Sequence, residues 1–138
     1  MLVLLLALAA ATPWIAYVGG LANVDGRPEP PTTGPLAEAE LEFLHLRFRK
    51  AGAFVVPQLS PFDYADGLLN DPDRLSGAGI RAAEAVAGNY ARSHLRIRHP
   101  FCTRVSEAAL TVWLTRNWSS NQVVSRAFEI EHARRSEG

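Results

Sequence analysis

Two neighbouring stretches near the C-terminus constrain the fold of this chain most strongly, because both repeat apolar residues at helical spacing. The first stretch, residues 103–117, has two apolar faces, and a helix that is apolar on more than one side is normally buried. Its faces consist of Val105, Ala108, Ala109 and Val112, and of Leu110, Trp113 and Leu114. The second stretch carries the stripe Val123, Ala127 and Ile130. The sequence therefore predicts two packed helices joined by a tight turn.

Polar residues mark the expected ends of these two helices. Thr103 is the expected N-cap of the first helix, because threonine oxygens accept hydrogen bonds from free backbone amides. Asn117 is expected to end that helix in the left-handed conformation, which asparagine tolerates. Ser119 and Gln122 have the spacing of a capping box, so the second helix is expected to begin there.

A pair of helices joined by a short turn is also the plan of the DNA-binding helix-turn-helix. DNA-binding domains usually carry a basic surface, whereas this chain has 14 Lys+Arg against 14 Asp+Glu. Glu129 and Glu131 also place negative charge on the second helix, which would have to enter the DNA groove. We therefore expect no nucleic-acid partner.

The N-terminal residues form an uncharged apolar run. No charged side chain occurs in residues 1–24, a length that just suffices to cross a bilayer. Trp14 and Tyr17 suit a membrane interface. We expect residues 1–20 to be a transmembrane anchor, and the alternative is a signal peptide that is cleaved at a small-residue site within residues 7–11.

Residues 21–34 are expected to form a linker behind this anchor. Gly19 and Gly20 are expected to interrupt regular structure, and the prolines and glycine that follow favour an extended, semi-rigid chain. These residues are Pro28, Pro30, Pro31 and Gly34. Such a linker would hold the following domain a short way off the bilayer.

Residues 35–138 are expected to form one helical domain. Pro35 is expected to open its first helix and Gly52 to stop it. Residues 53–56 form a short β-branched run, which predicts a brief strand or extended segment. Further helices are predicted over residues 61–69 and 77–89.

A basic segment precedes the helical pair, with Arg92, Arg96, Arg98 and Arg104 in sequence order. Alternation in residues 95–98 predicts a half-exposed strand with its arginines outward. The alternative is a site for a phosphate or diphosphate group, or for anionic lipid near the anchor. His94, His99 and Cys102 lie close in sequence, but their spacing matches no zinc pattern, so no metal site is expected there. As the single cysteine, Cys102 is expected to be a small buried side chain.

The segment 103–124 resembles a region of the peptidoglycan glycosyltransferases (glycosyltransferase family 51). That region reads Arg-Lys-x-x-Glu, then an Ala/Leu-rich helix, and then a Ser-Lys-x-x-Ile-Leu-Glu-x-Tyr-Leu-Asn helix. In this chain Arg104 stands at the family's lysine and Glu107 at its glutamate. Ser119 stands at the serine, and residues 123–124 at the Ile-Leu pair.

The resemblance is incomplete. Ser120, Ser125 and Ala127 replace a lysine, a glutamate and a tyrosine of the family. Residues 77–89 stand where the family has Gly-Gly-Ser-Thr-Ile-Thr-Gln-Gln-Leu-Ala-Lys-Asn, and Asn89 fits the last position. In the family, a carboxylate takes the proton from the acceptor hydroxyl, while cationic groups and a divalent metal stabilise the departing diphosphate.

The expected position of the family's catalytic glutamate falls near Arg49, which has the wrong charge. The resemblance therefore implies that Glu107 and Arg104 are what remains of the catalytic groups. The candidates for substrate contact are Asn89, Arg98 and Ser119.

The sequence and the resemblance together predict a mainly α-helical fold, a small lysozyme-like domain behind an N-terminal membrane helix, on the extracytoplasmic side. We expect a degenerate transglycosylase-like domain of the cell envelope that binds lipid-linked peptidoglycan precursor or glycan strands, or that acts as a scaffold. One alternative is an active, divergent peptidoglycan glycosyltransferase, which would use a divalent metal. The other is a small helical accessory subunit of a complex with other membrane proteins. No other cofactor is expected.

Overall fold

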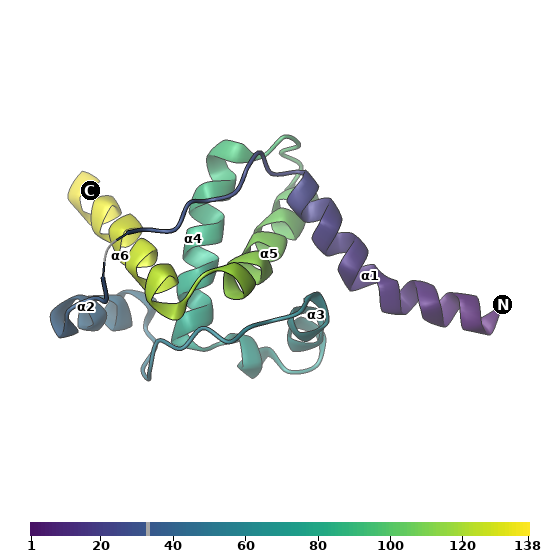
Figure 1. Cartoon of the computed structure of the whole chain (residues 1–138), viewed down its shortest axis with the longest axis horizontal. Coiled ribbons are helices and arrows are strands. Elements are labelled where there is room, and N and C mark those ends of the chain that lie inside the picture. Colours follow the sequence, from purple (N-terminus) through teal and green to yellow (C-terminus); the bar gives the residue numbers. More distant parts are fainter. Residues whose placement is uncertain (33) are drawn as a thin grey trace.

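A computed structural model describes residues 1–32 and 34–138 (Figure 1). These residues form six α-helices, one short 3-10 helix and no strand, which confirms the mainly α-helical class. The elements are α1 (Leu2–Ala22), α2 (Glu38–Phe48), α3 (Pro61–Leu69), η1 (Pro72–Leu75), α4 (Ala78–His94), α5 (Pro100–Asn117) and α6 (Ser120–Glu137).

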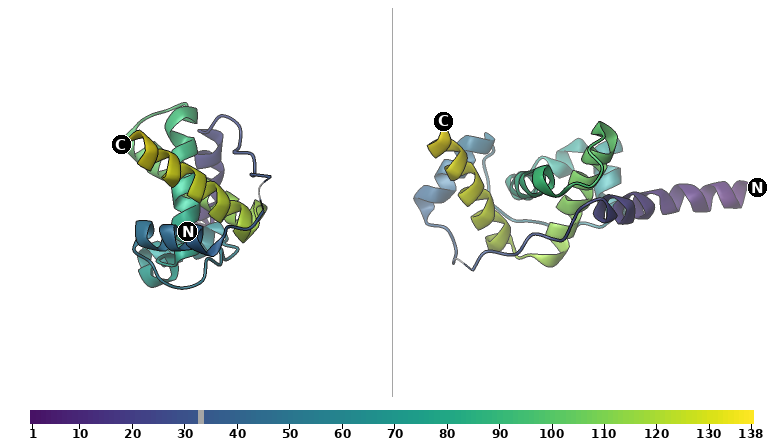
Figure 2. Two further views of the ribbon diagram at one scale, coloured as in Figure 1. Left: turned by 90° about the vertical axis from the view of Figure 1, so that its left-hand side faces the viewer. Right: turned by 90° about the horizontal axis from the view of Figure 1, so that it is seen from above.

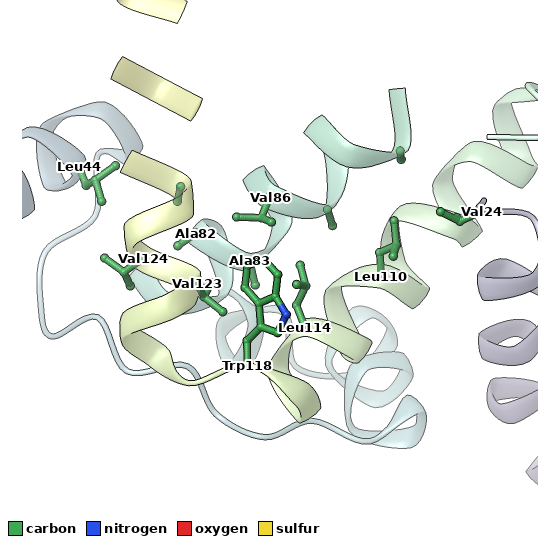
Figure 3. Packing of buried hydrophobic residues seen from close by; sticks show 13 residues of the cluster. Val24, Leu44, Ala82, Ala83, Val86, Leu110, Leu114, Trp118, Val123 and Val124 are labelled. Atoms are coloured by element: carbon green, nitrogen blue, oxygen red, sulfur yellow. The ribbon is translucent and has the colours of Figure 1, made fainter. Parts of the chain in front are cut away.

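The core forms where α4 packs against α5 and α6 (Figure 3). The side of α4 that faces these helices is built mainly from alanine, which lets the helix backbones approach closely. Larger side chains of α5 and α6 fill the remaining space, and each is worth roughly 1.5–3 kcal/mol when fully buried. The buried members from α4 to α6 are Ala82, Ala83, Val86, Ala87, Ala91, Leu110, Leu114, Trp118, Val123, Val124 and Ala127, and Val24 and Leu44 join them from other parts of the chain.

The predicted pair of C-terminal helices is present, with one boundary corrected. The first helix begins at Pro100, with His99 as its N-cap, and not after Thr103. Proline is favoured in the first turn because its missing amide would have no intrahelical partner there. The helix ends at Asn117 as predicted, but the chain continues through an extended residue and not a left-handed one. The capping box is confirmed, since the Ser119 hydroxyl accepts from the Gln122 amide at 3.2 Å.

Helix α1 lies beside α5 over its C-terminal half, whereas its N-terminal half extends away from the domain (Figures 1 and 2). The prediction that Gly19 and Gly20 interrupt regular structure was wrong, because α1 continues through both. Gly20 is buried against α5, where a Cβ would lie 2.7 Å from the Ala109 Cβ and 2.8 Å from the Val105 carbonyl oxygen. This glycine therefore serves close helix packing.

The segment that follows α1 is irregular, as predicted for a linker, but it lies against the domain and is not a spacer. Its carbonyl groups accept hydrogen bonds from α4 and α6 side chains: the Tyr90 hydroxyl donates to the Asp25 oxygen at 2.9 Å, and the Arg126 guanidinium donates to the Glu29 oxygen at 3.0 Å. Thr33, which also belongs to the predicted linker, lies outside the described residues.

The α2 helix begins at Glu38, three residues after the predicted Pro35. It ends at Phe48, because Arg49 takes the left-handed conformation (φ 53°), and therefore stops before the predicted Gly52. Residues 53–56, where a brief strand or extended segment was predicted, form neither a helix nor a strand.

Helices α3 and α4 confirm the predictions for residues 61–69 and 77–89. Gly79, in the first turn of α4, is required by close contact, because a Cβ there would lie 2.2 Å from the Val55 carbonyl oxygen.

The strand predicted over residues 95–98 was wrong. Val24 and Leu95 form a single antiparallel bridge. The Asn23 side chain then takes the place of further strand pairing: its amide donates to the Ile97 carbonyl at 3.0 Å, and its oxygen accepts from the Ile97 amide at 2.8 Å. These contacts fasten the end of α1 to the loop between α4 and α5.

Candidate functional site

An apolar groove is lined by the C-terminal half of α1, by α3 and by α5. Its volume is about 190 Å³. This is smaller than the roughly 300–1,000 Å³ of pockets that hold whole small molecules, so it suits a short stretch of a hydrocarbon chain. The lining residues are Pro13, Ala16 and Tyr17 of α1, Pro61, Tyr64, Ala65 and Leu68 of α3, and Val105, Ala108, Ala109 and Val112 of α5. None of them is charged.

Local sequence features position the α3 wall of this groove. Pro61 occupies the first turn of α3, and Ser60 caps the helix by accepting from the Asp63 amide at 3.1 Å. The Asp63 carboxylate accepts in return from the Ser60 amide and hydroxyl, at 2.9 and 2.7 Å. These two hydrogen bonds lower the pKa of Asp63. This reciprocal cap fixes the start of α3, and Tyr64 follows it directly.

A carboxylate cluster, defined as Tyr64, Arg81, Glu84 and Glu107, lies next to the groove where α3, α4 and α5 meet. The Tyr64 hydroxyl donates to Glu84 Oε1 at 3.4 Å, and Arg81 Nη1 lies 3.4 Å from Glu84 Oε2. Glu107 reaches α4 at Gly88, where its Oε1 is 3.9 Å from the position a Cβ would take. Because Gly88 follows Glu84 by one helical turn, the two carboxylates approach the same part of α4.

The electrostatics of this cluster favour protonated groups. Burial raises the pKa of Glu84, against the opposing effect of the Arg81 charge and the hydrogen bonds from Tyr64 and Arg81. Burial and then the negative charge of Glu84 raise the pKa of Tyr64 to about 12, with a smaller contribution from Glu107. A carboxyl group whose pKa is raised by burial is one that can serve as a general acid.

The five residues predicted from the sequence do not form one site. Glu107 and Arg104 are three residues apart on α5 and therefore neighbours on its surface, with Arg104 exposed. Asn89 lies on another side of α4, in a hollow toward the linker and α6. Arg98 lies in the loop before α5. Ser119 caps α6, about 18 Å along the α5 axis from Glu107 at 1.5 Å per residue.

Sequence reasoning missed Tyr64 and Glu84. The signal for Glu84 was present, because it is the only carboxylate among residues 78–91, an alanine-rich stretch with a clear inward face. It follows Ile80 by four residues, and Ile80 is buried, so the same side of the helix carries both. Tyr64 gave no comparable signal, since its partner lies 20 residues away.

Within the described part of the chain, no three His, Cys, Asp or Glu side chains gather closely enough to hold a metal ion. Cys102 is a half-buried free thiol, so it is less buried than predicted. Comparison with protein-family models, curated proteins and solved structures gives no match to this chain.

Proposed function

We propose that this chain is a membrane-anchored domain that binds an amphiphilic ligand of the cell envelope, the lipid-linked peptidoglycan precursor. The observation that carries the proposal is the position of Tyr64. Its ring lines the apolar groove, while its hydroxyl donates to Glu84 of the carboxylate cluster. An apolar surface and a polar, titratable surface therefore meet at one residue, which suits a ligand with a hydrocarbon chain and a polar head.

Helix α1 supports the membrane part of this proposal. It is long and apolar enough to cross a bilayer, and every leucine and valine side chain between Leu2 and Leu8 is 53–79% exposed. Exposed leucines in this number are costly in water and favourable in lipid. Cleavage as a signal peptide within residues 7–11 would still leave the α1 wall of the groove intact, because no residue before Pro13 lines it.

The polar end of the ligand would lie along α5 and α4. Arg104 and Glu107 immediately precede the groove residues Val105 and Ala108, so they form the neighbouring stripe of the same helix. An exposed guanidinium is well suited to a diphosphate, which it binds through two parallel hydrogen bonds. Glu84 and Glu107 provide acceptors for sugar hydroxyls. The resemblance to the peptidoglycan glycosyltransferases, which act on such a lipid-linked disaccharide, points to the same ligand.

A second candidate function, divergent glycosyltransferase activity, draws on the raised pKa of Glu84. Glu107 would then be the base that takes the proton from the acceptor hydroxyl, and Glu84 the neighbouring acid. A divalent metal would join Arg104 in stabilising the diphosphate. The accessory-subunit alternative requires neither group.

The test is binding and polymerisation of lipid-linked disaccharide by the full-length chain in detergent. Three variants address the site: Glu107→Gln, Arg104→Ala, and Ala108→Leu, which fills the groove. Ala133→Leu, on an exposed position of α6, adds the same bulk away from the groove. Saturable binding that the three site variants weaken about tenfold or more and Ala133→Leu leaves unchanged supports the proposal, since tenfold corresponds to roughly 1.4 kcal/mol.

The outcomes separate the three functions. Glycan polymer made by the wild type and lost in Glu107→Gln would identify an enzyme. Binding without polymer would identify a binding or scaffolding domain. Neither binding nor polymer overturns the proposal and leaves the accessory subunit, which would co-purify stoichiometrically with other membrane proteins.

A further inference from the structure

The loop between α4 and α5 exposes apolar side chains next to α1. Ile97 is 59% exposed and Phe101, in the first turn of α5, is 70% exposed. Both border a small hollow whose α1 wall includes Ala16 and Gly19. Large exposed apolar side chains beside an apolar helix extend its surface and are a feature of membrane-facing regions.

The segment that includes this loop, from the last turn of α4 to the first turns of α5, carries positive charge that its surroundings neutralise only in part. Residues 91–106 contain four arginines and no carboxylate. Arg96 is paired with Asp25 at 2.6 Å. Arg92 and Arg98 are exposed and form no ion pair with the described residues, and the Arg98 guanidinium donates to the Arg92 carbonyl oxygen at 2.9 Å. Exposed arginines of this kind bind phosphate groups.

The loop also lies beside the part of α1 where the membrane interface is expected. The hollow that it borders is lined on this side by Ala16, Gly19, Gly20 and Asn23, and Ile97 is hydrogen-bonded to Asn23, six residues or roughly 9 Å along the chain from Tyr17 of the aromatic pair Trp14 and Tyr17. Tryptophan and tyrosine favour the membrane interface. If the interface lies at these two residues, the segment Leu2–Pro13 places about 18 Å of helix in the bilayer, and the loop, which Figure 1 shows beside the C-terminal half of α1, lies on the headgroup side of the interface.

We infer that the α4–α5 loop is a second membrane contact, in which Arg92 and Arg98 bind anionic phospholipid headgroups while Ile97 and Phe101 insert among them. The inference rests on the membrane insertion of α1 that the proposed function includes. It does not extend to every exposed apolar residue. Leu46, which is 74% exposed, belongs to α2 on the side of the domain away from α1 (Figure 1) and serves as the internal control.

The test places a fluorophore on a single cysteine in the full chain carrying Cys102→Ser. The cysteine replaces Ile97, Leu46 or Leu5, and vesicles contain headgroup-quenching lipid in phosphatidylcholine alone or mixed equally with phosphatidylglycerol. We expect quenching at position 97 in the mixed vesicles, little in phosphatidylcholine, and none at position 46. Arg92→Gln with Arg98→Gln should lower the docked population about 25-fold, since each arginine near an anionic surface contributes about fivefold.

Lys50→Gln with Arg135→Gln removes the same charge from the side of α2 and α6 and should leave quenching at position 97 unchanged. Hydrogen exchange of the unmodified chain provides a measurement without substitutions: residues 95–99 should exchange more slowly on mixed vesicles than on phosphatidylcholine.

Two failures are distinguishable. A probe at Leu5 that is not shielded in the acyl region shows that α1 does not insert, which overturns the anchoring in the proposed function. The second failure is that the probe at Leu5 is shielded but the fluorophore at position 97 is quenched no more than the one at position 46. Equal quenching at position 97 in both kinds of vesicle has the same meaning, and either result overturns the loop inference alone.

Discussion

The close packing of α1 on α5 at Gly20 gives a matched pair of substitutions, Gly20→Ala and Gly19→Ala. The two glycines are adjacent in α1, and both substitutions gain the same helix propensity, about 0.8–1.0 kcal/mol. They differ in surroundings. A Cβ on Gly19 meets nothing within 4 Å, whereas a Cβ on Gly20 would lie 2.7 Å from the Ala109 Cβ and 2.8 Å from the Val105 carbonyl oxygen.

The magnitude follows from this difference. Overpacking a well-packed contact costs typically about 1–3 kcal/mol. Because the propensity gain is common to both variants, it cancels when they are compared. Gly19→Ala should therefore raise the free energy of unfolding by up to about 1 kcal/mol. The free energy of unfolding of Gly20→Ala should be about 1–3 kcal/mol lower than that of Gly19→Ala. For a chain of this size, this difference corresponds to roughly 3 °C in Tm for each kcal/mol.

Thermal unfolding in mild detergent, followed by far-ultraviolet circular dichroism, measures the effect. Adding Ala109→Gly to Gly20→Ala removes one of the two close contacts but leaves the Val105 carbonyl in place, so it should rescue only part of the loss. Equal Tm values for the two glycine variants, or a gain in both, would refute the argument that α1 packs on α5 through Gly20.

Three further predictions concern the rest of the domain. Ser119→Ala removes the cap of α6 and should cost about 1 kcal/mol in urea unfolding, with unchanged helix content below the transition. Glu131 is 4% exposed and is held by two arginines, so Glu131→Ala should lower the free energy of unfolding by about 1–3 kcal/mol. Glu129 forms an exposed ion pair with Arg126, so Glu129→Ala should lower it by less than about 0.5 kcal/mol. Equal losses in the two variants would contradict this ranking. Burial raises the pKa of Glu84, so the folded protein favours the protonated form of this side chain. The resulting contribution to stability is fully present below the ordinary pKa of 4.5 and is lost as the pH rises through the raised pKa. Glu84→Gln, which stays neutral, should therefore gain stability relative to the wild type between acid and neutral pH, and a constant difference over that range would rule out burial of the Glu84 charge.

Helix periodicity and capping chemistry predicted much of the fold because these signals are local. Ser119 and Gln122 specify a cap within three residues, and the structure forms it. The errors came from contacts between distant residues. Gly20 stays helical because α5 lies against it, and the predicted strand over residues 95–98 is replaced by hydrogen bonds to Asn23, more than 70 positions earlier in the chain.

The site was less predictable for the same reason. Glu107 was a candidate from the sequence, but Tyr64 and Glu84, which we place with it in the carboxylate cluster, come from α3 and α4, and only the packing of three helices brings these elements together. The predicted residues that lie elsewhere, such as Ser119, were chosen by their position in a linear match. A linear match does not say which side of a helix a residue occupies.

The way in which the chain leaves α1 limits where the domain can reach. Asn23 and Asp25 hold the end of α1 to the loop and to α4, and Arg126 holds the following residues to α6. When a flexible linker joins a membrane anchor to its domain, the domain can move through a large volume and bind partners far from the bilayer. This domain has no such tether in its described residues, so its orientation follows that of α1. If α1 inserts as we propose, the domain is held close to the bilayer and meets mainly molecules that diffuse within the membrane or along its surface. For the ligand that we propose, lateral diffusion in two dimensions would then set how often the groove is filled.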